Sequence, residues 1–133
     1  MRIQNILFIA ILSFASCTES QVSTQSATEV LATDGHSVIT AESFKNLLTA
    51  EDIQLIDVRT PEEFSAGTID DAQNVDFLGP NFEKNIASFD KSKTVLIFCK
   101  SGGRSGKASK KMLEMGFVRV IDLSGGYSGW PYK

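Results

Sequence analysis

The chain has 133 residues, of which 9% are aromatic and 22% are charged, values that are ordinary for a soluble globular protein. This length fits one domain. Its 13 Lys and Arg residues against 16 Asp and Glu residues give a net charge of −3, and the basic residues are scattered. Nucleic-acid binding needs a basic face, so we expect no nucleic acid among the partners.

The first 16 residues have the pattern of an export signal. A positive start at Met1-Arg2 is followed by a mostly apolar run over residues 3–14 and then by the small pair Ala15-Ser16. The apolar run is shorter than the roughly 20 residues that a membrane-spanning helix needs. The segment FASC, residues 14–17, resembles a bacterial lipoprotein signal box, in which Cys17 becomes the lipidated first residue. The alternative is an ordinary signal peptide followed by a chance cysteine.

Lipidation of Cys17 would hold the protein on the periplasmic side of a bacterial membrane by its acyl chains alone, and we expect the outer membrane. An ordinary signal peptide predicts a soluble periplasmic protein instead. Lipidation would also leave Cys99 as the only free thiol, with no internal disulfide possible.

Residues 17–36 are rich in Ser, Thr, Gln, Glu and Ala and poor in apolar side chains. This composition cannot bury enough surface to offset the entropy of ordering, and it predicts a flexible tether. His36 is then a solvated residue at the end of the tether. The folded domain is predicted to span residues 37–133.

Apolar runs alternate with helix signals from residue 37 onward. We expect strands over residues 53–58, 69–75, 94–98 and 118–123. We expect helices from Thr40 through Leu48, from Pro61 to near Gly67, over 81–89 and over 104–115, the second of them opened by a capping box of Thr60 and Glu63. Alternation of this kind predicts an α/β domain with a parallel sheet. Ligands bind such sheets at the carboxyl ends of the strands, where Asp57 and Cys99 both fall.

Cys99 follows the strand at residues 94–98 directly and opens a Gly-rich loop, CKSGGRS over residues 99–105. Backbone N–H groups in such a loop can converge on the sulfur, and the helix N-terminus behind it adds roughly half a positive charge. Both effects favour the thiolate, which is the nucleophilic form of cysteine. The pattern therefore predicts a thiolate nucleophile that needs no histidine as general base.

The other loop residues suit a small sulfur-containing anion as substrate. Lys100 and Arg104 place two cations near the thiolate and can hold the oxygens of the anion. Ser101 and Ser105 supply hydroxyl donors, while the glycines at 102 and 103 let the backbone curl.

Cys99 is either a reactive nucleophile or an unreactive part of the core. It could be a buried small side chain without reactivity, as free cysteines often are. The nucleophile hypothesis requires the sulfur of Cys99 to be reachable from solvent. The spacing of Cys and His residues fits no metal site, and we expect neither a metal nor another cofactor.

Five segments, in order, resemble the single-domain rhodanese family of thiosulfate-type sulfurtransferases. They are LIDVRTPEEF (55–64), GTI (67–69), AQNV (72–75), CKSGGRS (99–105) and LSGGYSGW (123–130). Thr68 and Asp76 stand where that family often has His and Pro. The resemblance covers about residues 38 to 130 and implies a rhodanese-like α/β fold, with a central, mostly parallel sheet of about five strands and helices on both faces.

The resemblance implies that Cys99 accepts a sulfur atom from a thiosulfate-like donor and becomes a persulfide. Lys100, Ser101, Gly102, Gly103, Arg104 and Ser105 would form the cradle around that persulfide. A thiol, cyanide or a protein cysteine would then accept the sulfur. Related phosphatases of this fold have one more residue between Cys and Arg, so the four residues here favour sulfur over phosphate.

Supporting roles are implied for three further residues. Arg59 is expected to pair with Glu63 or Asp70, and Asp57 to support the loop. We expect a monomer. The alternative function is a persulfide carrier or sulfur-relay module with little turnover of small donors.

Overall fold

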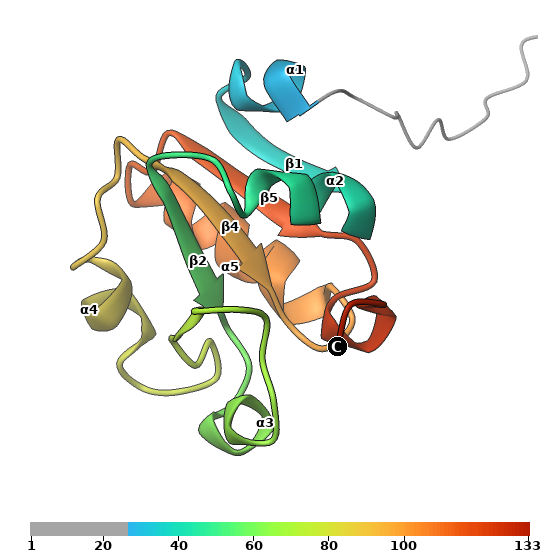
Figure 1. The fold of residues 1–133 in the computed structure, drawn as a ribbon. Helices are drawn as coiled ribbons and strands as arrows, with labels where there is room; N and C mark the ends of the chain where they lie inside the picture. Colours follow the sequence, from blue (N-terminus) through green and yellow to red (C-terminus); the bar gives the residue numbers. More distant parts are fainter. Residues whose placement is uncertain (1–26) are drawn as a thin grey trace, which may run out of the picture.

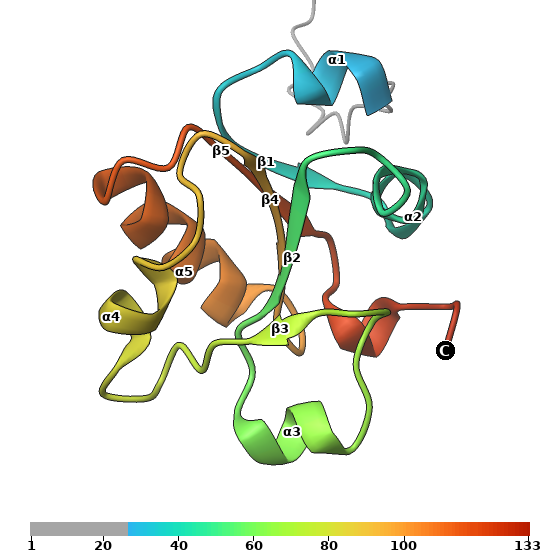
Figure 2. The same cartoon turned by 60° about the vertical axis from the view of Figure 1, so that its left-hand side comes forward.

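The computed structural model describes residues 27–133, so the predicted signal segment and Cys17 lie outside the described residues. Five parallel strands form one sheet in the order β1-β5-β4-β2-β3 (Figures 1 and 2). The strands are β1 (Gly35–Ile39), β2 (Ile53–Asp57), β3 (Gln73–Asn74), β4 (Thr94–Phe98) and β5 (Arg119–Leu123). The predicted α/β class and the five-stranded parallel sheet are confirmed.

Helices cover both faces of this sheet. They are α1 (Ala27–Leu31), α2 (Ala41–Leu47), α3 (Pro61–Ser65), α4 (Phe82–Ile86) and α5 (Gly103–Glu114), followed by a 3-10 turn, η1 (Tyr127–Gly129). Figure 2 shows α4 and α5 on one side of the strands and α1 and α2 on the other. In the part of the chain from residue 27 to 133, no helix combines the length and apolar character needed to cross a bilayer.

The central strand β4 determines on which face of the sheet Cys99 lies. All five of its residues are buried. Because successive side chains of a strand point to opposite faces, Val95 and Ile97 pack with Cys99 against α4 and α5, whereas Leu96 and Phe98 face α1 and α2. The chain therefore leaves β4 with the thiol on the α5 side of the sheet.

Local signals predicted several helix boundaries well. The capping box of α3 is present: the Thr60 hydroxyl accepts from the Glu63 N–H, and the Glu63 carboxylate accepts from the Thr60 N–H. Helix α5 ends at Glu114, two residues before Gly116, which adopts a φ of +97°. The predicted strand over residues 69–75 is shorter than expected, because only Gln73 and Asn74 pair with β2.

The prediction of a flexible tether through residue 36 is wrong for its last ten residues. Helix α1 buries Val30 to 2% exposure, and β1 pairs with β5, with His36 opposite Val120. His36 is exposed, but it belongs to this paired strand and is not a linker residue. Strand β1 lies at the edge of the sheet with alternating exposed positions, so it needs few apolar residues, and composition alone does not reveal it.

Two matched substitutions test whether this N-terminal segment belongs to the fold. Val30→Ala removes buried methyl groups and should lower the free energy of unfolding by about 2 kcal/mol. Val38→Ala makes the same chemical change on a side chain that is 57% exposed, and should cost less than about 1 kcal/mol. Urea unfolding followed by circular dichroism measures both, and equal effects would contradict the folded role of α1.

Candidate active site

Cys99 lies at the carboxyl end of β4, at the point where the chain turns into α5. Gly102 makes this turn possible with a φ of +105°, a conformation that side-chain-bearing residues rarely adopt. The Gly102 N–H donates a hydrogen bond to the Cys99 Sγ at 3.0 Å. The Ser105 hydroxyl, one turn into the helix, lies 3.4 Å from the same sulfur. The loop thus surrounds the sulfur with donors, as the sequence predicts for a thiolate.

These donors determine whether the pKa of Cys99 lies above or below the ordinary value. Burial raises the pKa of the thiol, whereas hydrogen bonds from the Ser105 side chain and from the backbone N–H groups of Ser105, Gly102 and Ser101 lower it. The lowering effects together are larger, so the pKa lies below the ordinary value for cysteine. Donors that stabilise the anion make Cys99 a candidate nucleophile.

The sulfur is nevertheless closed off from solvent. Cys99 is only 1% exposed, although its loop neighbours Lys100, Ser101 and Gly103 lie on the surface. The expectation of a sulfur reachable from solvent is therefore not met by this conformation. The two adjacent glycines, Gly102 and Gly103, give the loop beside the sulfur more backbone freedom than other residues would.

Arg104 is held at the loop by a carboxylate from α3. Its two terminal nitrogens donate to the Glu63 Oε atoms at 2.6 and 2.9 Å. The hydrogen bond from Arg104 holds the pKa of Glu63 down at about 2. Since Glu63 also caps α3, this single side chain fixes α3 to the loop of Cys99. The predicted pairing of Glu63 with Arg59 is wrong.

Arg59 pairs with Asp57 instead. Both side chains are buried, and the Arg59 Nη2 lies 2.6 Å from the Asp57 Oδ2 and 2.6 Å from the Gly67 carbonyl oxygen. The Thr68 hydroxyl donates to the same Asp57 Oδ2 at 2.9 Å. Asp70, the other expected partner of Arg59, takes no part in this pair. The arrangement is a buried structural ion pair whose oxygens are hydrogen-bonded, as such a pair requires.

This ion pair reaches the active loop through an aromatic ring. The Arg59 guanidinium lies over the Tyr127 ring, 4.1 Å from its centroid. The Tyr127 N–H donates to the Cys99 carbonyl oxygen at 2.8 Å, and the Ser128 N–H donates to the Lys100 carbonyl oxygen at 2.9 Å. Contacts thus connect Asp57 to the loop through Arg59 and the turn at η1.

Sequence reasoning missed the residues of this turn as part of the site. Gly126 lies in the segment LSGGYSGW (123–130), and its Cα packs directly on the loop backbone. A Cβ on Gly126 would lie 2.6 Å from the Cys99 oxygen and from the Lys100 carbonyl carbon. The signal that could have identified it is the Gly125-Gly126 pair, since paired glycines also mark a close approach of two backbone segments.

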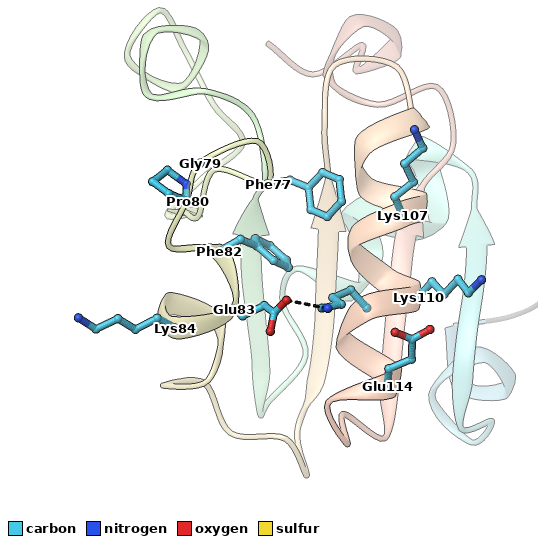
Figure 3. A pocket seen from close by; sticks show the side chains of 10 residues that line it. Phe77, Gly79, Pro80, Phe82, Glu83, Lys84, Lys107, Lys110 and Glu114 are labelled. Carbon is cyan, nitrogen blue, oxygen red and sulfur yellow. Dashed lines mark ion pairs between the residues drawn. The ribbon is translucent and has the colours of Figure 1, made fainter.

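One cavity in the described part of the chain lies near the site but does not contain the sulfur. It has a volume of about 720 Å³ and lies between α4 and α5, with Phe77 and Phe82 on its wall and the Glu83–Lys111 ion pair across it (Figure 3). Cys99 is not among the residues that line it. Across residues 27–133, no group of three or more His, Cys, Asp or Glu side chains is placed to hold a metal ion.

Comparisons with known proteins agree with this geometry. The family model described as "Rhodanese-like domain" matches residues 40–132. "Thiosulfate sulfurtransferase 16, chloroplastic" from Arabidopsis thaliana is 42% identical over 85 residues, which cover 56% of this chain and 71% of that protein. A "Sulfurtransferase" from Allochromatium vinosum is 36% identical over 87 residues, which cover 65% of this chain and 78% of that protein. Among solved structures, a rhodanese-like domain protein from Staphylococcus aureus is similar with a TM-score of 0.62 and 32% identity, covering 71% of this chain and 90% of that one.

Gly126→Ala tests whether the η1 turn positions the sulfur. The new methyl group must displace the backbone of residues 99 and 100, so we expect a loss of about 1–3 kcal/mol in stability and a rise in the pKa of Cys99. Gly129→Ala in the same turn is the control, because its Cβ would meet nothing within 4 Å. Urea unfolding and the pH dependence of iodoacetamide alkylation at Cys99 measure the two effects. An unchanged Cys99 titration in Gly126→Ala would rule out this positioning role.

Proposed function

This chain belongs to the rhodanese-like family, and we propose that it transfers sulfane sulfur from a thiosulfate-like donor to a thiophilic acceptor through a persulfide on Cys99. Membership in this family, with relatives named as sulfurtransferases, supports sulfurtransferase activity in general. The donor, the acceptor and the persulfide step are our proposal. The observation that carries it is the Cys99 sulfur, held between the Gly102 N–H and the Ser105 hydroxyl, with its pKa below the ordinary value.

The proposed reaction is a double displacement. The Cys99 thiolate attacks the outer sulfur of thiosulfate, the sulfur–sulfur bond of the donor breaks, and sulfite leaves with the bonding electrons. The terminal sulfur of the new persulfide carries the negative charge, which the loop N–H groups stabilise. Cyanide or a thiolate then attacks that terminal sulfur, and Cys99 leaves as the thiolate. Lys100 and Arg104 at the loop would orient the sulfonate oxygens of the donor.

The same chemistry also supports a second function, that of a persulfide carrier. The specific observation in its favour is the burial of Cys99 to 1% exposure. A sulfur atom held under a closed loop is shielded from small thiols and would be released slowly. Steady-state kinetics separate the two functions, because an enzyme turns over repeatedly whereas a carrier loads once and releases slowly.

Cys99→Ser should abolish sulfur transfer from thiosulfate to cyanide while leaving the fold intact. A serine hydroxyl is not ionised by these donors near neutral pH and does not form a persulfide. Thiocyanate formation measures turnover, and mass spectrometry of the thiosulfate-treated protein should show one added sulfur atom on the peptide that contains Cys99. Cys17→Ser is the matched control and should keep full activity. Activity retained in Cys99→Ser would contradict the mechanism.

We also propose that the protein is exported and anchored by lipid on Cys17, on the periplasmic side of a bacterial membrane and most simply the outer one. Support comes from the FASC segment at residues 14–17, after a positive start and an apolar run. The wild-type chain should incorporate labelled palmitate and sediment with membranes, whereas Cys17→Ser should do neither. A wild-type chain that stays unlabelled and soluble in the periplasm would show that an ordinary signal peptide is present.

A further inference from the structure

The cavity between α4 and α5 takes no part in the proposed reaction. It has a volume of about 720 Å³ and an aromatic wall made by Phe77 and Phe82, whose rings meet edge to face with their centroids 5.1 Å apart. Figure 3 shows both rings pointing from the side of α4 toward α5. Aromatic side chains at the wall of a cavity favour contact with an apolar side chain of a ligand.

Basic side chains surround this aromatic wall. Four lysines and two glutamates line the cavity: Lys84, Lys107, Lys110, Lys111, Glu83 and Glu114. Four positive and two negative groups give the lining a net charge of +2, whereas the whole chain carries −3. The Lys111 Nζ is paired with the Glu83 Oε1 at 2.6 Å. Among the ion pairs of residues 27–133, none involves Lys84, Lys107 or Lys110, and Figure 3 shows Lys84 and Lys110 extending outward from the rim.

The lysines of α5 are not explained by the stability of the helix. Lys107 is three residues before Lys110 and four before Lys111, so these like charges are neighbours on the helix surface and repel one another. A row of solvated lysines would explain the charge, but not the half-buried Phe77 and the 67% exposed Leu78 that lie beside it in the chain segment next to α4. Positive charge next to exposed apolar surface favours a role in binding a negatively charged partner.

The cavity extends to the edge of the sheet where Cys99 lies. The Phe77 N–H donates to the Val58 carbonyl oxygen at 3.1 Å, and the Val58 N–H donates to the Phe98 carbonyl oxygen at 3.0 Å. Lys107 is in the second turn of α5, about one turn from the loop of Cys99. Figure 3 shows Phe77 and Lys107 at the end of the cavity toward which the strand arrows point. A partner seated in the cavity therefore has its nearest surface beside this loop.

The burial of Cys99 favours a protein as the occupant. Cys99 is 1% exposed, and an acceptor held beside the loop has a high effective concentration at a buried sulfur, which a free small thiol does not have. A hollow surface with an aromatic wall also fits a protein segment better than it fits the plane of a lipid bilayer. The lysines of the rim require that segment to be acidic.

We propose that this cavity is the docking site for an acidic segment of a protein that accepts the sulfur of Cys99. Carboxylates of the segment pair with Lys107 and Lys110 at the rim, and an apolar side chain packs on Phe77 and Phe82. A cysteine thiolate of the bound partner attacks the terminal sulfur of the Cys99 persulfide. The partner gains that sulfur and becomes the persulfide, while Cys99 leaves as the thiolate with the bonding electrons. This docking role rests on the proposed function, which supplies the persulfide.

Fluorescence anisotropy tests the binding step by itself. The probe is a fluorescein-labelled synthetic peptide with glutamates on both sides of one phenylalanine, and the protein is the full chain with Cys99→Ser. Lys107→Glu should weaken binding about fivefold or more, because it replaces an attraction by a repulsion. Lys91→Glu makes the same change of charge at an exposed position outside the cavity, and should change the affinity less than about twofold, because salt screens a distant charge.

The peptide offers two further controls. Replacing its glutamates by glutamines should remove the difference between Lys107→Glu and the parent chain, and replacing its phenylalanine by alanine should weaken binding through the lost contact with the aromatic wall. No binding of the acidic peptide up to about 1 mM, or equal effects of Lys107→Glu and Lys91→Glu, would overturn the proposal.

Single-turnover transfer shows whether docking delivers the sulfur. The Cys17→Ser chain is loaded with thiosulfate, freed of excess donor and mixed with two cysteine peptides, one rich in glutamate and one rich in lysine. Mass spectrometry should show sulfur reaching the acidic peptide at least about fivefold faster, and Lys107→Glu should remove most of this preference. The ratio of the two rates is the readout, because it does not depend on how much persulfide has formed. A preference that Lys107→Glu leaves unchanged would contradict the proposal.

Other occupants of the cavity would give a different pattern. Sedimentation of the Cys17→Ser chain with phosphatidylglycerol vesicles that depends on Lys107, without binding of the peptide, would identify a membrane surface. A dimer in sedimentation equilibrium that Lys107→Glu dissociates, again without binding of the peptide, would identify a second copy of this chain. Either result would overturn the proposal.

These outcomes are distinct from a failure of the proposed function. Anisotropy reports binding to the Cys99→Ser chain, which transfers no sulfur. Binding that depends on Lys107, without thiocyanate formation by the wild-type chain, would remove the sulfurtransferase proposal and keep the docking site for acidic segments. Thiocyanate formation without such binding would remove the docking site and keep the enzyme.

Discussion

A negative sulfur at the end of a buried strand must be surrounded by hydrogen-bond donors, and the rest of the site follows from this constraint. Strand β4 is buried along its whole length and delivers Cys99 to an interior position. The η1 turn fixes the loop by binding the Cys99 and Lys100 carbonyl oxygens. The loop held in this way donates to the sulfur from the Gly102 N–H and the Ser105 hydroxyl. The turn therefore holds the backbone of the loop in place without contacting the sulfur through a hydrogen bond.

Arg59 pairs with Asp57 and Arg104 pairs with Glu63, and the local backbone geometry explains why. The spacing of Arg59 and Glu63 suggests an ion pair within one helix, but Arg59 precedes the cap of α3 and is not helical. Its side chain instead reaches back to Asp57, two residues earlier. Glu63 is the third residue of α3, where the capping box directs its carboxylate toward the helix start and toward Arg104. Residue spacing cannot distinguish these arrangements, because the cap determines the direction of the side chain.

The structural features that the sequence predicts best are those that depend only on residues close together in the chain. The apolar run of β4, the capping box of α3 and the Gly-rich loop after Cys99 are local signals, and each lies where it was expected. Strand β1 was missed because its stability comes from pairing with β5, about 85 residues away. The approach of Gly126 to the loop and the pairing of Arg104 with Glu63 were missed for the same reason. Each joins two segments that are far apart in the sequence and that only the fold brings together.

Two buried aspartates flank β4 and show how the alternation of side chains assigns different roles to one residue type. Asp57 on β2 is opposite Phe98 and shares the face of α1 and α2, where Arg59 and Thr68 satisfy its oxygens. Asp122 on β5 is opposite Ile97 and shares the face of Cys99, between Ile121 and Leu123, which point the other way. A shift of one residue in the register of β5 would move Asp122 to the other face of the sheet, away from α5. The parallel pairing of β5 with β4 therefore places a titratable carboxylate on the side of the sheet where the nucleophile lies.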